Sequence, residues 1–125
     1  MPVTDPVALV AATNADPEFA LAARYWNASL ALRAPDRLWR VEIANGRVTG
    51  CREADGAPAT ITITASNDGW REFLAPVPRP FYQDLLGGCV QHHGFTVAGD
   101  ILVLNAYYHA LQRLFAIMRA LRAGR

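Results

Sequence analysis

The side chains that most readily carry catalysis or bind metals are few in this chain of 125 residues. It holds two cysteines, Cys51 and Cys89, and three histidines. His92 and His93 are neighbours in an expected strand, so their side chains point to opposite faces and cannot share a metal ion. Cys89 and His93 are four residues apart, a spacing that pairs side chains only on a helix, and the surrounding glycines disfavour a helix. The sequence therefore predicts no metal site and no nucleophilic Cys-His dyad.

Composition excludes several further kinds of chemistry. All twelve basic residues are arginine, so no lysine is present for a Schiff base or a phosphate clamp. A formal net charge of +1 supplies no broadly basic surface for nucleic acid. Asp68, Glu72 and Asp84 are expected on helix surfaces without a partner, and no phosphate-binding loop or nucleophile elbow is present. We expect a protein that is not an enzyme, has no cofactor and has no nucleic-acid partner.

Several features of the sequence indicate the cellular compartment. Residues 1–20 carry acidic side chains and lack the basic and then apolar pattern of a secretory signal. The apolar segment 101–112 is too short to cross a bilayer, which takes about twenty residues. Two cysteines outside a Cys-x-x-Cys pair do not define a disulfide framework. We expect a cytoplasmic protein with reduced thiols and no stable membrane insertion.

Polar residues before apolar runs predict where the helices begin. Asp5 and Asp16 each precede a proline, which places an N-cap carboxylate before the first helical residue. Ser66 is a further N-cap candidate. Asp100 is expected to cap the longest element, a single helix over Ile101–Leu121.

Alternation of apolar and polar residues predicts the strands. Four are expected at 28–32, 38–43, 47–52 and 59–65, and a fifth at 92–98. Asn45-Gly46 predicts a hairpin between the second and the third. The order of elements is typical of one α+β domain over residues 1–125, with helices packed on one face of a mostly antiparallel five-stranded sheet.

The expected last helix has more apolar surface than contact with a sheet requires. Its polar side chains form one narrow stripe, namely Asn105, His109, Gln112 and Arg113. Arg113, Arg119 and Arg122 suit the negative end of the helix dipole. A helix lying on a sheet needs an apolar arc of about 100°. The excess is expected to meet another helix of the chain, a second subunit or an apolar ligand.

Three stretches resemble the sterol carrier protein type 2 domain. They are the run 39–48, the transition from ribbon to helix over Thr60–Trp70, and Gly94–Asp100 before the long apolar helix. The resemblance extends over residues 18–121. It implies a five-stranded sheet whose helices enclose an apolar tunnel for a small hydrophobic ligand, that is, a sterol, a fatty acid or an acyl chain. It also implies binding or transfer without catalysis.

The resemblance further implies which residues line the tunnel. They are apolar or aromatic and come from the helices and the last strand: Trp70, Phe73, Phe81, Leu85, Phe95, Leu104, Tyr108, Leu111 and Phe115. Arg79 lies in the segment Pro76–Pro80, which is expected to run extended before a short helix over 81–86. We take Arg79 as the candidate for contact with a head-group carboxylate, and we expect this segment to move when a ligand enters.

Three other functions remain open from the sequence. A small cone-shaped isomerase or hydratase of a hydrophobic substrate would need a buried pair such as His93 with Asp84 or Glu72. An interaction module would use the apolar arc of the last helix to form a homodimer. Alternatively, the same helix would dock at a membrane interface, with Arg113, Arg119 and Arg122 near anionic lipid.

Overall fold

The computed structural model describes residues 2–54, 56–76, 85 and 95–124. The elements are α1 (Pro6–Ala15), α2 (Pro17–Ala22), β1 (Ala28–Ala34), β2 (Arg37–Ala44), β3 (Arg47–Glu53), β4 (Ile61–Thr64), α3 (Asn67–Phe73), β5 (Thr96–Gly99), α5 (Ile101–Ala106) and α6 (Tyr108–Arg122). The first four strands match their predicted ranges to within two residues at either end. Two predicted elements lie partly outside the described residues. Of the predicted helix over 81–86 only Leu85 is described, and of the predicted last strand residues 92–94 are not described.

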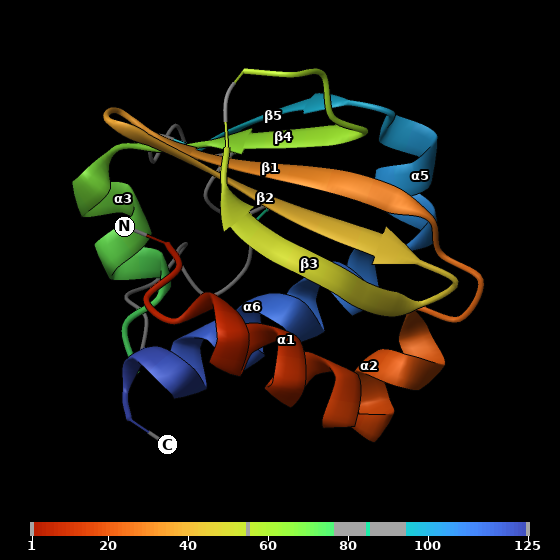
Figure 1. Ribbon diagram of the computed structural model, residues 1–125. Coiled ribbons are helices and arrows are strands. Elements are labelled where there is room, and N and C mark those ends of the chain that lie inside the picture. The colour runs from red at the N-terminus through yellow and green to blue at the C-terminus, as the bar shows by residue number, and fades with distance from the viewer. Residues whose placement is uncertain (1, 55, 77–84, 86–94, 125) are drawn as a thin grey trace.

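The strands form one mixed sheet in the order β3-β2-β1-β4-β5. Neighbours pair antiparallel except β1 and β4, which are parallel because the chain returns from the edge strand β3 to the far side of β1. Figure 1 shows α1, α2 and α6 beneath the sheet, with α3 at one end and α5 at the other. The predicted class, α+β with helices packed on one face of a mostly antiparallel five-stranded sheet, is confirmed.

Inward-facing residues of the central strands build the core. Leu30 and Leu32 of β1, Val41 of β2, and Ile61 and Ile63 of β4 are almost fully buried. The register places Leu30 opposite both Val41 and Ile61, so these side chains form one row across the inner face. The threonines that alternate with the two isoleucines are partly exposed, which confirms the predicted alternation.

Four helices begin at the predicted caps. The side-chain oxygens of Asp5, Asp16, Ser66 and Asp100 each accept a hydrogen bond from the amide three residues later, at 2.7 to 3.1 Å. Each bond satisfies one amide that has no partner within its helix. The caps therefore fix where α1, α2, α3 and α5 start.

The predicted hairpin between β2 and β3 is confirmed. Asn45 and Gly46 both have positive φ angles, 50° and 77°, as a two-residue type I′ turn requires. The Gly46 amide also donates to the carbonyl of Trp26 at 2.9 Å. A Cβ on Gly46 would lie 2.7 Å from the carbonyl oxygen of Ala23, so the turn packs directly on the end of α2.

The single helix predicted over Ile101–Leu121 is wrong, because α5 and α6 are separate helices. Tyr107 interrupts them with φ −117° and ψ 23°. Its ring stacks on Trp26 at 5.0 Å between centroids, and its hydroxyl donates to the carbonyl of Arg24 at 3.4 Å. Packing on a distant part of the chain thus overrides the local helical pattern. None of the helices in the described part of the chain combines the length and apolarity needed to cross a bilayer.

The broad apolar surface of α6 is used within the chain. Its residues Leu111, Leu114, Phe115, Ile117 and Met118 are buried. Besides the sheet side, α6 contacts α1 and α2. Of the three partners proposed for the excess apolar arc, the structure therefore shows one, namely other helices of the same chain.

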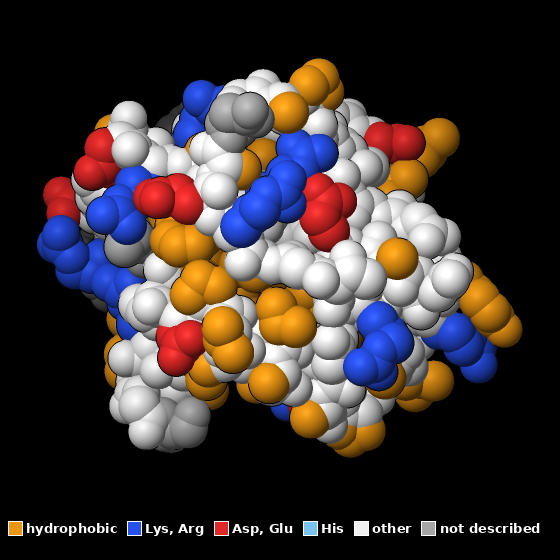
Figure 2. Space-filling model, viewed as in Figure 1, with side chains coloured by type: hydrophobic (Ala, Val, Ile, Leu, Met, Phe, Trp, Pro, Cys, Tyr) orange, Lys and Arg blue, Asp and Glu red, His pale blue; other side chains and the backbone are white. Residues whose placement is uncertain are grey.

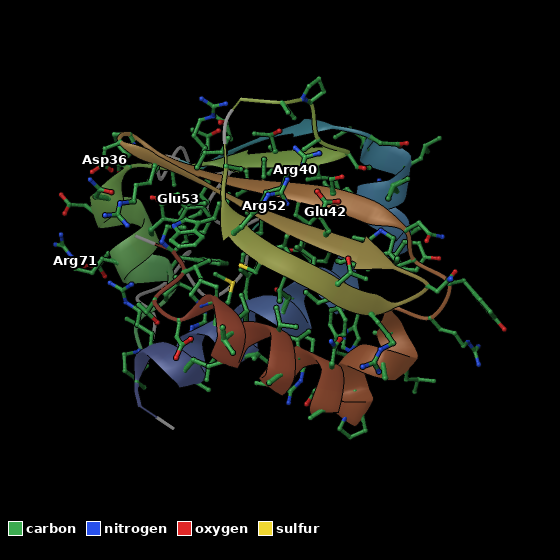
Figure 3. All side chains as sticks on the ribbon, in the orientation of Figure 1. Asp36, Arg40, Glu42, Arg52, Glu53 and Arg71 are labelled. Carbon is green, nitrogen blue, oxygen red and sulfur yellow. The ribbon has the colours of Figure 1, made fainter. Side chains whose placement is uncertain are left out.

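The opposite face of the sheet is polar. Figure 2 shows acidic and basic side chains gathered over the strands, with apolar side chains mainly below them. Arg40, Glu42 and Arg52 lie together over the middle of the sheet in Figure 3. The helices thus enclose the apolar side, where a hydrophobic ligand would have to lie.

Candidate ligand-binding site

Four aromatic side chains meet where α3, α6 and the start of β5 come together. We call Trp70, Phe73, Phe95 and Phe115 the aromatic cluster. Ring centroids are 5.2 Å apart for Trp70 and Phe95, 5.1 Å for Phe73 and Phe95, and 4.9 Å for Phe73 and Phe115. All four are at most 4% exposed. The structure thus brings together four of the nine residues that the sequence selected for the tunnel lining.

Local structure explains how the cluster is held. Ser66 caps α3, which directs Trp70 and Phe73 inward, and the Trp70 indole N–H donates to the carbonyl of Arg33 at 3.0 Å. A Cβ at Gly69 would lie 3.2 Å from the Ser66 hydroxyl oxygen, a tight contact, and 3.5 Å from the Phe95 ring, an ordinary one. The rings of Trp70 and Phe95 meet edge to face at 74°, an arrangement that aromatic pairs favour.

The other residues predicted to contact the ligand differ in burial, and some of them are not described. Leu85, Leu104 and Leu111 are buried in the same core as the cluster. Tyr108 is only half-buried, at the start of α6. Phe81 and the head-group candidate Arg79 lie outside the described residues. Ligand contact by any of these residues stays a prediction.

The aromatic cluster is packed ring against ring, and the larger hollows lined by described residues lie elsewhere. One of about 260 Å³ runs between α1 and α6. Its lining is mainly apolar: Ala12, Asp16, Arg113, Ala116, Ile117, Ala120 and Leu121. The predicted apolar tunnel therefore remains a prediction.

Two polar hollows flank the turn between β1 and β2, with volumes of about 400 and 410 Å³. Side chains of both charges line the first: Asp36, Arg37, Asn67, Arg71 and Arg122. Asp36, Arg71 and Glu53 mark this end of the molecule in Figure 3. Arg71 pairs with Asp68 at 2.9 Å and Arg37 with Glu53 at 3.4 Å. Two of the arginines that line these hollows are thus already paired with carboxylates.

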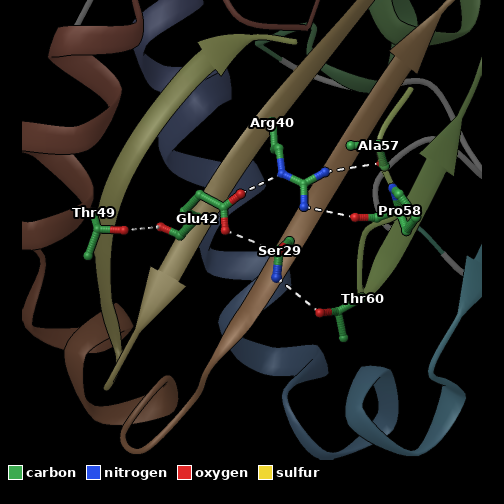
Figure 4. A network of polar contacts seen from close by, with 7 residues as sticks. All are labelled: Ser29, Arg40, Glu42, Thr49, Ala57, Pro58 and Thr60. Carbon is green, nitrogen blue, oxygen red and sulfur yellow. Dashed lines mark hydrogen bonds and ion pairs between the residues drawn. The ribbon is translucent and has the colours of Figure 1, made fainter. Parts of the chain in front are cut away.

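A polar network on the open face of the sheet is structural (Figure 4). The Arg40 guanidinium donates to the Glu42 carboxylate, and to the carbonyls of Ala57 at 3.1 Å and Pro58 at 2.8 Å. The hydroxyl of Ser29 donates to Glu42 at 3.0 Å. The hydrogen bond from Arg40 lowers the pKa of Glu42, with further lowering from Ser29. The network keeps this carboxylate ionised and bound, which suits it poorly for acid-base catalysis.

The described thiol is also a poor nucleophile. Cys51 is half-buried and unpaired, and burial raises its pKa to about 11. It therefore carries very little thiolate near neutral pH. Cys89, His93 and Asp84 lie outside the described residues. Within the described ranges, no group of three or more His, Cys, Asp or Glu side chains is placed to hold a metal ion.

Two arginines of α6 have roles that the sequence did not indicate. Arg113 pairs with the carboxylate of Asp16, at 2.8 Å, on the N-terminal helices. Arg119 donates from two nitrogens to the carbonyl of Phe73, at 3.1 and 2.6 Å, at the end of α3. Both arginines thus contact other elements, and Arg119 also lies with Arg122 in the last turn of α6, as predicted. No local sequence signal marks these long-range contacts.

Comparison with known proteins assigns the fold. No family model matches the chain, and no curated protein matches it in sequence. Among solved structures, the crystal structure of sterol carrier protein 2 superposes with a TM-score of 0.75 at 22% identity, covering 90% of this chain and 92% of that one. The solution structure of TT1886 from Thermus thermophilus, described as a possible sterol carrier protein, gives 0.70 at 24% identity, with 90% and 82% covered.

A third structure is more distant in sequence. The ubiquinone synthesis protein UbiJ-SCP2 gives a TM-score of 0.61 at 14% identity, with 90% of each chain covered. The chain therefore shares an α+β fold with these three structures. Its fold is that of sterol carrier protein 2, as the three sequence stretches suggested.

Proposed function

We propose that the protein binds a small hydrophobic ligand, namely a fatty acid, a sterol or another acyl chain, and transfers it without catalysing a reaction. The observation that carries this proposal is the buried aromatic cluster, which lies between α3, α6 and β5 in a fold shared with sterol carrier protein 2. We also propose that residues 1–125 act as one domain and that the protein works in the cytoplasm.

The energetics favour a long apolar ligand. Removing a methylene group from water contributes about 0.8 kcal/mol, before the cost of association is subtracted. A chain of about ten buried methylenes would thus supply about 8 kcal/mol of gross stabilisation. Aromatic rings add favourable edge and face contacts with such a chain. Affinity is accordingly expected to rise with chain length until the interior is filled.

Two observations weigh against the alternative functions. Glu42 is a carboxylate on the sheet whose pKa is lowered. Arg40 holds it on the open face, away from the apolar interior where a hydrophobic substrate would bind. The apolar residues expected to form a homodimer seam, including Leu111 and Phe115, are buried by the chain itself. Neither an isomerase or hydratase nor a dimerisation module thus gains support from the described residues.

Lipid analysis tests the proposed function. Native mass spectrometry of protein purified without detergent should show a bound mass in the range of a lipid, and the delipidated protein should bind a fluorescent fatty acid that unlabelled palmitate displaces. A protein that is lipid-free after purification and binds no fatty acid would rule the function out.

Two neighbouring residues provide a matched pair of variants. Phe95 belongs to the cluster, whereas Thr96 is exposed on β5. Phe95→Trp adds volume where the ligand chain would pack, so binding should weaken several-fold. Thr96→Trp adds a larger group at the surface and should leave binding unchanged. Equal binding by both variants would place the ligand elsewhere on the protein.

A further inference from the structure

Arg119 lies directly against the aromatic cluster. It is half-buried on α6, and its guanidinium carbon is 5.4 Å from the centroid of the Phe73 ring. Its Nε and Nη2 both donate to the Phe73 carbonyl, at 3.1 and 2.6 Å. The side chain is therefore held in one orientation by backbone and ring together, as in a preformed binding group.

The positive charge of Arg119 is not neutralised by a carboxylate of the described residues. Among these residues, Arg40, Arg71 and Arg113 each pair with an acidic side chain. Arg119 instead has a neutral carbonyl as its partner, which occupies two of its five N–H groups. Burial lowers the pKa of Arg119, because water around the cation is reduced without a counter-ion in its place.

The chemistry of this position fits a carboxylate. A guanidinium presents parallel N–H groups that match the two oxygens of a carboxylate, and such charge-assisted bonds are stronger than neutral ones. The Phe73 side chain contacts both Arg119 and the rings of Phe95 and Phe115. A ligand whose chain packs on the cluster could therefore place its head at Arg119.

We propose that Arg119 binds the carboxylate head group of a fatty acid whose chain packs against the aromatic cluster. The inference rests on the proposed function and narrows it, since a fatty acid would be preferred over a neutral lipid of the same length. Arg119 is thus a candidate for the head-group contact on α6, while Arg79 lies outside the described residues.

The test compares an acid with its neutral analogue. Palmitate and hexadecanol differ at the head group and share the same chain length, and their affinities for the whole chain can be measured at pH 8 by tryptophan fluorescence. The wild-type protein should bind palmitate about tenfold more tightly, and Arg119→Gln should lose that preference while still binding hexadecanol. The matched control is Arg52→Gln, which removes an exposed arginine on the open sheet face and should keep the preference.

The possible results distinguish a failure of the Arg119 proposal from a failure of the proposed lipid binding. Equal wild-type affinities, or an Arg119→Gln variant that keeps the preference, would overturn the role of Arg119 and leave lipid binding intact. Failure to bind either compound would overturn both. If Arg119→Gln does not fold, palmitate labelled with carbon-13 at its carboxyl decides the matter by NMR. Its bound pKa should fall below the free value beside a cation, whereas a raised pKa would contradict the proposal.

Discussion

Arg113 of α6 donates two hydrogen bonds to the carboxylate of Asp16, from Nε at 2.9 Å and from Nη2 at 2.8 Å. The same carboxylate accepts the amide of Phe19 at 2.7 Å as the N-cap of α2. One acidic side chain thus starts a helix near the N-terminus and ties it to the last helix. This link fixes the helical layer beneath the sheet, against which the aromatic cluster is assembled.

Removing either partner should destabilise the fold. Asp16→Ala loses a cap and an ion pair, so we expect a loss of about 2 to 3 kcal/mol in urea unfolding. Arg113→Ala keeps the cap but loses the pair with Asp16 and a longer ion pair with Glu18 at 3.9 Å, and it should cost about 1 to 2 kcal/mol. The double variant should reveal a coupling energy of about 1 kcal/mol. Purely additive effects would show that the two side chains do not cooperate.

The surface pair Arg71 and Asp68 is the control for that cycle. It has a similar distance, 2.9 Å, but its side chains are 66% and 83% exposed. Water and salt screen such pairs, so the coupling energy should be close to zero. A coupling as large as that of the Asp16 pair would show that burial is not the cause of the difference.

Stability should depend on pH through Asp16. Its pKa is lowered from 3.8 to about 2, mainly by the hydrogen bond from Arg113. The ionised carboxylate therefore stabilises the fold fully above about pH 5, and this contribution is lost as the pH falls toward 2. The side chain is only 13% exposed, and the shift corresponds to about 2 kcal/mol. Asp16→Asn should be less stable than the wild type at pH 7, and the difference should shrink below pH 4. A difference that stays constant down to pH 2 would contradict this assignment.

Replacing Gly99 at the end of β5 should destabilise the fold. Its φ is 123°, and a Cβ there would lie 2.1 Å from the carbonyl oxygen of Thr60 on the neighbouring segment. Gly99→Ala must both strain the backbone and displace β5, which should cost at least about 2 kcal/mol. Gly50→Ala is the matched control on β3, where a Cβ would meet nothing within 4 Å. Thermal unfolding should show a large fall in Tm for the first variant and little change for the second. Equal effects would contradict the crowding at Gly99.

We expect the ring of Tyr107, more than its hydroxyl, to stabilise the connection between α5 and α6. Tyr107→Ala removes the stack on buried Trp26, so the connection between α5 and α6 should loosen at a cost of about 2 kcal/mol. Tyr107→Phe keeps the ring and loses only a 3.4 Å hydrogen bond, which should cost less than about 0.5 kcal/mol. Urea unfolding of the two variants measures both values. A phenylalanine variant as unstable as the alanine variant would assign the role to the hydroxyl.

Features set by neighbouring residues were predictable from the sequence. The caps at Asp16 and Ser66 depend on side chains that reach an amide three residues away. The Asn45-Gly46 turn depends on two residues that tolerate positive φ. Strand alternation depends on a period of two, which the burial of Ile61 and Ile63 reproduces. These signals are local, and together they specify the order of the elements and the inner face of the sheet.

Features set by distant contacts were not predictable. The break at Tyr107 arises from packing on Trp26, while the local pattern around it continues to favour a helix. The partners of Arg113 and Arg119 likewise lie on other helices. Of the candidate site, the sequence could select apolar residues such as Trp70, but only the fold reveals which of them touch and which cation lies beside them.

The most direct measurement is the contact between ligand and cluster in solution. Palmitate should be added to the isotope-labelled protein, and nuclear Overhauser effects between its methylene protons and the protein's aromatic protons should be recorded. A ligand bound in the interior should give effects to the rings of Trp70, Phe73, Phe95 and Phe115. Effects confined to surface residues, or no effects with palmitate in excess, would contradict a ligand bound in the interior.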